Sequence, residues 1–234
     1  MDFKNVQVFN FEGAIRGMRN PMNSWDKSDS KEEKGTFIIG PNDLGLMQRL
    51  INGGSEHRKF MRQIFVSVDI TAPLYFWSEF DTYKVGTCAN STSKMHKLAT
   101  TPITIDCFET DDYQDALQWH NQDDYLIEYD SSNSINAFVD MLENLRLKYL
   151  ETKDKRYWKE LIRWLPESWL QTRTVTLSYE NLFSMIRQRK NHKLNEWSGK
   201  DNPLNKNFIA FAKTLPYAKE LLFFGLEEES FDKT

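Results

Sequence analysis

The chain has 234 residues, of which 40% are hydrophobic and 14% aromatic, and its formal net charge is −4. This composition supports a sizeable core and excludes a disordered chain, and the acidic balance argues against a general nucleic-acid surface. Two cysteines exclude a disulfide framework, Cys and His pairs lack zinc spacing, and no apolar run approaches a membrane span. The N-terminus resembles no signal peptide, so we expect a cytoplasmic protein without nucleic-acid, membrane or metal partners.

The first part of the chain alternates short strands with a helix. Residues 5–12 are typical of a strand, and the polar stretch 20–35 of a loop. Leu44, Met47, Leu50 and Ile51 fall at helical spacing, which predicts a helix that starts at Asn42 or Asp43 and stops at Gly53. In "RQIFVSVDI" the residues Ile64, Val66, Val68 and Ile70 alternate with others, which predicts a strand.

The second part is richer in helices. Pro73 suits the first turn of a short helix, "PLYFWSEFD". The acidic segment 100–132 is expected to be a surface insertion. Further on, the patterns predict helices at 135–149, 155–164 and 180–190, a strand "TRTVTLSY", a cap at Ser178, and final helices within 203–224 interrupted near Pro216. We therefore predict a single α+β domain over 1–234, with a small, mostly antiparallel sheet and a helical layer.

The stretch 79–97, "EFDTYKVGTCANSTSKMHK", follows the predicted short helix and is almost entirely polar. Hydroxyl groups and lysines on a loop after Gly86 suit a phosphate, although a solvated loop has the same composition. The chain has no P-loop and no G-x-G-x-x-G motif. Cys88 has no identifiable base nearby in sequence, so we do not assign it as a nucleophile.

Two further places carry groups that suit a ligand. Arg189 continues the apolar face of its predicted helix, while Arg187 and Lys190 are expected to point elsewhere. An arginine on a buried face needs a partner, which is either a carboxylate or a ligand phosphate. The motif "GGSEH" runs from Gly53 to His57. Its two glycines allow the backbone to approach a ligand closely, and Glu56 and His57 could orient a cofactor. A simple helix cap and turn is the alternative interpretation.

These pieces occur in the order found in flavin-dependent thymidylate synthases. "GPNDLGLMQRLINGGSEHRKF" resembles the family's helix with its Glu-His end, and "ITAPLYFWSEFDTYKVGTCANSTSKMH" resembles the segment that carries the signature R-H-R-x-x-S-x-N-x-x-S-x-R-Y. "WLPESWLQTRTVTLSYENLFSMIRQRKNHKLNEW" resembles the C-terminal strand and helix. The resemblance covers about 40–97 and 135–225. The R-H-R triplet falls on Thr82, Tyr83 and Lys84, whereas N-x-x-S is kept from Asn90 to Ser93.

The resemblance implies the family's fold and its reaction. FAD would carry hydride from NADPH, methylenetetrahydrofolate would supply the carbon, and dUMP would become dTMP without a cysteine nucleophile. The family is homotetrameric with sites at subunit junctions. The residues implied are, for catalysis, Arg189, Glu79 and Ser93; for FAD, Glu56, His57, Tyr83, Lys84 and Asn90; and for dUMP, Arg173, Arg189, Ser93, Lys94 and Glu79.

Two other functions stay open. A relative that binds a pyrimidine nucleotide with lost or altered methyl transfer is favoured by the absent R-H-R triplet. A non-catalytic interaction protein would keep only the scaffold. The retained Arg173, Arg189 and Ser93 disfavour that last alternative.

Overall fold

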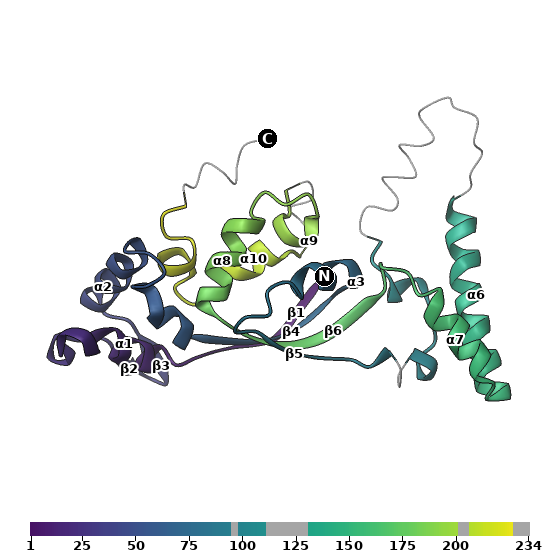
Figure 1. Cartoon of the computed structure of the whole chain (residues 1–234), viewed down its shortest axis with the longest axis horizontal. Coiled ribbons are helices and arrows are strands. Elements are labelled where there is room, and N and C mark those ends of the chain that lie inside the picture. The colour runs from purple at the N-terminus through teal and green to yellow at the C-terminus, as the bar shows by residue number, and fades with distance from the viewer. Residues whose placement is uncertain (95–97, 111–130, 201–205, 227–234) are drawn as a thin grey trace, which may run out of the picture. The chain divides into compact units, whose positions relative to one another are not determined.

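The computed structural model describes residues 1–94, 98–110, 131–200 and 206–226, with the side chains of 131–134 left aside (Figure 1). The chain forms two compact units. The first comprises residues 1–70, 81–90 and 174–234, and the second comprises 71–80 and 91–173. That the whole chain is one domain stays a prediction.

The main sheet has four strands, β1 (Asp2–Phe9), β4 (Phe65–Pro73), β6 (Leu170–Ser178) and β5 (Cys88–Ser91), in that spatial order. The sheet is antiparallel, as predicted. The first unit illustrates this: the Tyr179 backbone N–H donates to the Ile64 carbonyl, and further along Thr174 donates to the Asp69 carboxylate. The division between the units falls within β4, β5 and β6.

Strand β4 shows the predicted alternation. Val66, Val68 and Ile70 are buried, while Phe65 is exposed and Asp69 is half-buried. Alternating residues point to opposite faces of a strand, so one face of β4 packs into the core and the other remains accessible. Pro73 is the last residue of this strand rather than part of a helical turn, which corrects the prediction. A backbone bond from Leu74 to the Trp169 carbonyl keeps the chain extended up to that point.

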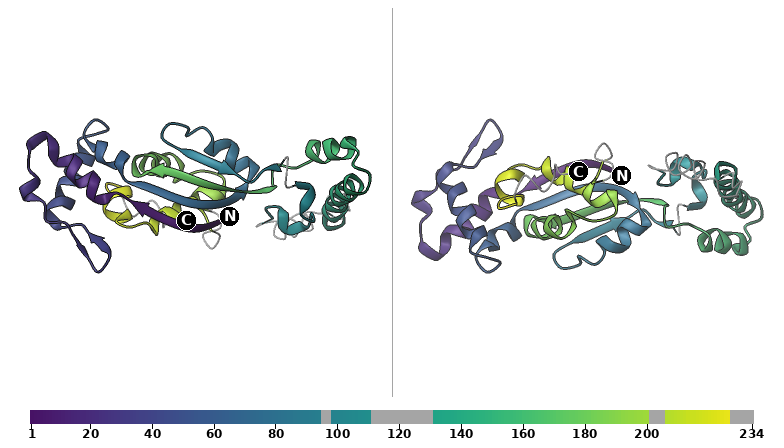
Figure 2. Two further views of the ribbon diagram at one scale, coloured as in Figure 1. Left: turned by 90° about the horizontal axis from the view of Figure 1, so that it is seen from below. Right: turned by 90° about the horizontal axis from the view of Figure 1, so that it is seen from above.

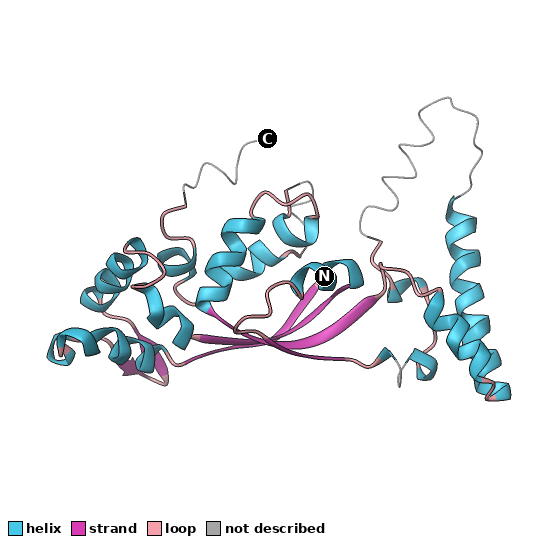
Figure 3. Cartoon of the chain, viewed as in Figure 1, coloured by secondary structure: helices cyan, strands magenta, loops and turns pink. Residues whose placement is uncertain are grey.

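The helices of the first unit are α1 (Phe11–Arg19), α2 (Pro41–Asn52), α8 (Tyr179–Arg189), α9 (Asn195–Ser198) and α10 (Phe208–Lys213), followed by a π-helical turn, Ala218–Leu222. Helices α8 and α10 pack on each other, and Figure 1 shows them on one side of the strand segments of the first unit, which Figure 2 shows from two opposite sides. The predicted loop at 20–35 holds two 3-10 turns, Asn20–Met22 and Trp25–Lys27, and the strand β2 (Lys31–Glu33). That strand pairs with β3 (Thr36–Ile38) in a separate two-stranded sheet (Figure 3).

Helix α8 begins where the sequence predicted. The Ser178 hydroxyl accepts from the Asn181 backbone N–H, and the Asn181 side chain accepts in return from the Ser178 backbone, which forms a capping box. Leu182, Met185 and Ile186 are fully buried on the inner face of the helix. Cap and apolar face together fix both the start and the rotation of α8, and therefore the direction in which Arg189 leaves its last turn.

The second unit contains α3 (Leu74–Phe80), α6 (Ser131–Thr152) and α7 (Lys155–Arg163). It also has 3-10 turns at Leu98–Thr100 and at Ile105–Cys107. Its core gathers six buried side chains: Leu98, Ile103, Phe108, Val139, Leu142 and Leu161. We predicted that residues 100–132 form a surface insertion. For Ile103 and Phe108 this prediction is wrong, because both side chains are buried and pack against Val139 and Leu142 of α6. Residues 111–130 lie outside the described residues. In the described part of the chain, no helix has the length and apolarity needed to cross a bilayer.

Candidate functional site

Of the polar stretch 79–97, the part that lies in the first unit starts with a turn that is bonded to α8. Gly86 has a φ of 77°, a conformation that glycine adopts without strain. The Thr87 hydroxyl donates to the Tyr83 carbonyl at 2.6 Å, and the Asn181 side-chain amide donates to the Val85 carbonyl at 2.7 Å. Asn181, the partner of Ser178 in the α8 capping box, thus also holds the turn that carries Tyr83.

Tyr83 meets Arg189 across this turn. The Arg189 Nε–H donates to the Tyr83 hydroxyl at 2.8 Å, and the same hydroxyl donates to the Gln188 side-chain oxygen at 3.0 Å. The sequence offered a carboxylate or a ligand as the partner of Arg189. At Nε the structure has the Tyr83 phenol, a neutral acceptor that the sequence did not suggest.

Trp197 of α9 supports this pair from the core. Its side chain is fully buried, and the Arg189 guanidinium carbon lies 5.0 Å from the centre of its ring. The Tyr83 ring lies 6.1 Å from the Trp197 ring, and Phe208 packs on the indole at 5.1 Å. Helix α9 was not predicted. A four-residue helix leaves no periodic signal, and the tryptophan in "NEWS" was its only trace in the sequence.

Arg173 has a similar environment in the second unit. Its Nε–H donates to the Gln171 side-chain oxygen at 3.0 Å, and its guanidinium carbon lies 4.3 Å from the Trp77 ring centre. The Trp77 indole N–H donates to the carbonyls of Ala72 and Gln171, which fixes the ring. Both predicted substrate arginines are therefore half-buried, with a neutral acceptor at Nε and an indole beside the guanidinium.

Arg187 contradicts the sequence interpretation. It was expected to point away from the inner face of α8, but it is half-buried, with its guanidinium carbon 3.1 Å from the Phe183 ring centre. It donates to the carbonyls of Leu222 and Phe224 at 2.9 and 2.7 Å. Burial, reinforced by the nearby charge of Arg58, lowers the pKa of Arg187 to about 10. Leu222 is the last residue of the π-helical turn and Phe224 follows two residues later, so Arg187 donates to carbonyls at and just beyond the end of the turn, where a helix leaves acceptors open.

The other predicted site residues lie in different surroundings. In the first unit Glu56, His57, Lys84 and Asn90 are exposed, and Glu56 approaches Lys59 at 4.0 Å. In the second unit Glu79, Ser93 and Lys94 are half-buried. Of the predicted residues within the first unit, the structure brings Tyr83 and Arg189 into direct contact. The roles of the whole set stay predictions.

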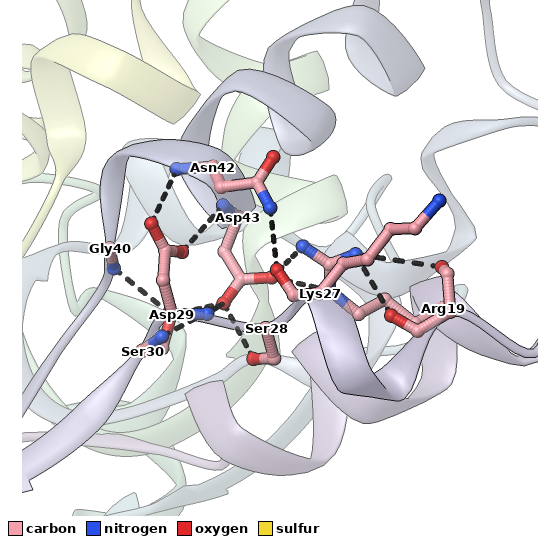
Figure 4. Close-up of polar contacts among 9 residues, drawn as sticks. Arg19, Lys27, Ser28, Asp29, Ser30, Gly40, Asn42 and Asp43 are labelled. Atoms are coloured by element: carbon pink, nitrogen blue, oxygen red, sulfur yellow. Dashed lines mark hydrogen bonds and ion pairs between the residues drawn. The ribbon is translucent and has the colours of Figure 1, made fainter.

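A separate polar network, missed by the sequence analysis, lies near the N-terminus (Figure 4). The Asp43 carboxylate is fully buried and accepts from Arg19 at 2.6 Å, from the hydroxyls of Ser28 and Ser30 at 2.7 and 2.6 Å, and from two backbone N–H groups. Burial acts to raise the pKa of Asp43, but these hydrogen bonds outweigh it and leave the pKa below its ordinary value. The sequence did carry a signal for this network, because Asp43 lies in the first turn of a predicted helix and follows a serine-rich loop.

Beside this network lies a hollow of about 380 Å³. Its walls include Ile15, Trp25 and Phe37, and Arg19 of the network also lines it. None of the predicted site residues lines it. The network itself joins α1, the loop after it and α2.

Comparison with known proteins supports the expected fold. Neither the models of protein families nor the curated proteins give a match to this chain. Among solved structures, the flavin-dependent thymidylate synthase ThyX from Helicobacter pylori, complexed with FAD and dUMP, matches with a TM-score of 0.63 and 19% identity, covering 95% of this chain and 98% of that chain. A second structure of thymidylate synthase X from the same organism, with FAD and dUMP, has a TM-score of 0.63 and 17% identity over the full length of both chains. The chain has the fold of these enzymes, which confirms for the fold the resemblance seen in the motifs.

Proposed function

We propose that this protein is a flavin-dependent thymidylate synthase, which methylates dUMP to dTMP with methylenetetrahydrofolate as carbon donor and NADPH as reductant. The observation that carries the proposal is the near-full-length fold match to an enzyme whose structures hold FAD and dUMP. Fold alone does not fix a reaction, so the proposal depends on the side chains that the fold positions.

The substrate end of the proposal rests on two arginines whose Nε–H donates to a neutral acceptor and whose guanidinium lies beside an indole. Arg189 beside Trp197, and separately Arg173 beside Trp77, would donate to oxygens of dUMP. Charge-assisted bonds of this kind are about twice as strong as neutral ones. An indole beside a guanidinium also holds its plane, because the ring face attracts the cation. Ser93, Lys94 and Glu79 are proposed to complete the contacts with dUMP.

The residues proposed for FAD suit that cofactor chemically. FAD carries a diphosphate and a ring system rich in hydrogen-bonding groups, and Lys84, His57 and Asn90 offer an exposed cation, an imidazole and an amide. Together with Glu56 and Tyr83 they would hold the cofactor. Bound FAD supplies the hydride chemistry. The protein side chains would bind, orient and exclude water, which is how a protein assists a cofactor.

A second candidate function is a protein that binds a pyrimidine nucleotide but has lost or altered methyl transfer. One observation favours it. Where the family signature has R-H-R, this chain has Thr82, Tyr83 and Lys84, and the Tyr83 hydroxyl is bonded to Arg189 and Gln188. That phenol replaces the family's imidazole with a different chemistry at the position between the two lost arginines.

Absorbance and turnover separate these functions. A purified protein with a flavin spectrum that releases tritium from 5-labelled dUMP, given the carbon donor and NADPH, supports the synthase. A colourless protein that binds dUMP without releasing tritium supports the second function. Absence of both flavin and dUMP binding, even with FAD added, rejects both and leaves a scaffold protein. We also propose a cytoplasmic homotetramer, which light scattering after gel filtration tests for its mass.

A further inference from the structure

The turn that carries Tyr83 and the last turn of α8 share one hydrogen-bond chain. It runs from the Arg189 Nε–H to the Tyr83 hydroxyl at 2.8 Å, and from that hydroxyl to the Gln188 side-chain oxygen at 3.0 Å. We infer that Tyr83 is a positioning residue for Arg189, fixing the plane in which this guanidinium meets an anionic pyrimidine nucleotide. The inference rests on the proposed role of Arg189 in nucleotide binding.

The hydroxyl constrains Arg189 in a specific way. A guanidinium is planar, so one bond at Nε together with the ring beneath it restricts rotation about the last bonds of the side chain. The Trp197 ring centre lies 5.0 Å from the guanidinium carbon and the Tyr83 ring centre 5.5 Å. Two aromatic rings and one hydrogen bond therefore define the orientation of a side chain that would otherwise lose rotamer freedom on binding its ligand.

The Tyr83 hydroxyl is itself held at two points. The Tyr83 hydroxyl accepts from Arg189 while donating its own proton to Gln188, so its geometry is fixed from both sides. Trp197 is fully buried, whereas Tyr83 and Arg189 are half-buried and Gln188 is exposed, so a buried indole packs beside a partly solvated hydrogen-bond chain.

Tyr83 occupies the position at which the family signature has the histidine of R-H-R. None of the three residues of that triplet is kept in this chain. Gly86 and Asn181 hold the turn, so the phenol is presented to Arg189 by a rigid support. In this chain Tyr83 therefore influences nucleotide binding by orienting the Arg189 guanidinium.

A double-mutant cycle on dUMP affinity tests the inference, with equilibrium dialysis of labelled dUMP as the assay. Tyr83→Phe keeps the ring and removes the hydroxyl, and we expect the Kd for dUMP to rise about tenfold. In an Arg189→Ala background, which by itself weakens binding, Tyr83→Phe should change the Kd less than about twofold, because coupled residues are not additive. A purely structural role would weaken binding in both backgrounds.

The matched control is Tyr217→Phe, which removes another half-buried hydroxyl that accepts a backbone N–H, from Ile39 at 2.8 Å. It should leave the Kd for dUMP unchanged. If Tyr83→Phe fails to fold, Gln188→Met serves in its place. It removes the acceptor that orients the phenol, and we expect a two- to threefold rise in Kd that also vanishes in the Arg189→Ala background.

The outcomes separate the two proposals. If the unchanged protein binds dUMP and Tyr83→Phe binds it equally well, or loses the same factor without Arg189, the positioning role is refuted while the proposed function stands. If the unchanged protein fails to bind dUMP, with or without FAD, the proposed function is refuted and the positioning role with it.

Discussion

Replacing Asp43 by asparagine should destabilise the first unit strongly, and the structure gives the size of the effect. The Asp43 side chain has 0% exposure and its partner Arg19 has 3%. Asparagine keeps the shape and one acceptor oxygen but removes the negative charge, so Arg19 remains buried as an uncompensated cation. Breaking a buried ion pair from one side costs about 3–5 kcal/mol.

The hydrogen bonds to the Asp43 carboxylate support a loss of stability within this range. Two serine hydroxyls and the backbone N–H groups of Asp29 and Ser30 lose an anionic acceptor at Oδ2. Their separate contributions are not additive, since they share one oxygen. We therefore expect a loss of about 4 kcal/mol in the free energy of unfolding, equivalent to a fall of about 10 °C in Tm.

Urea unfolding followed by tryptophan fluorescence and far-UV circular dichroism measures the effect. The double variant Arg19→Met with Asp43→Asn is the control, and it should recover part of the loss because no unpaired charge stays buried. A loss below about 1 kcal/mol for Asp43→Asn, against the 3–5 expected, would refute the argument that this pair holds α1, the loop and α2 together.

The same variant has a defined pH dependence. The folded-state pKa of Asp43 lies below its ordinary value of 3.8, so the carboxylate stabilises the fold above that pH. This contribution disappears as the pH falls from about 3.8 through the lower folded pKa. The stability gap between the unchanged protein and Asp43→Asn should therefore be full at pH 7 and narrow below pH 3.8. A gap that stays constant down to the acid transition contradicts this reasoning.

Three other substitutions test separate parts of the structure. Arg187→Ala should lower the free energy of unfolding by about 1.5–3 kcal/mol in urea, because the carbonyls that end the chain's π-helical turn lose a charged donor, and Arg187→Lys should restore only part of it. Asn181→Ala should cost about 1–2 kcal/mol through loss of the α8 capping box. It should also weaken dUMP binding by freeing the Tyr83 turn, which a loss of stability at unchanged Kd would contradict. Arg173→Ala should weaken dUMP binding by about 1.5–3 kcal/mol in calorimetry, and an unchanged Kd would remove Arg173 from the proposed site.

The predictions that held depend on local patterns. The alternation in β4 and the helical spacing in α2, α6 and α8 identify elements because one buried face dictates a period of two or of about 3.6 residues. Ser178 was recognised as a cap for the same reason: its bonds reach only to Asn181, three residues away. The prediction that Ile103 and Phe108 lie on the surface was wrong, because the acidic residues that follow them made the whole segment look polar.

The sequence by itself determined the α+β class, the presence and order of α2, β4, α6, α7, β6 and α8 and, through three motifs, the family whose fold the chain adopts. Only the tertiary structure decided which side chains meet. Tyr83 and Arg189 are 106 residues apart, and Arg19 and Asp43 are 24 apart. No local period encodes such pairs, because each depends on how elements far apart in the sequence pack. Tyr83 and Arg189 meet where a turn, a capped helix and a short unpredicted helix pack around Trp197, and Arg19 meets Asp43 where α1 packs near α2. For that reason the sequence offered Arg189 a carboxylate or a phosphate as its partner, and packing supplied a phenol at Nε.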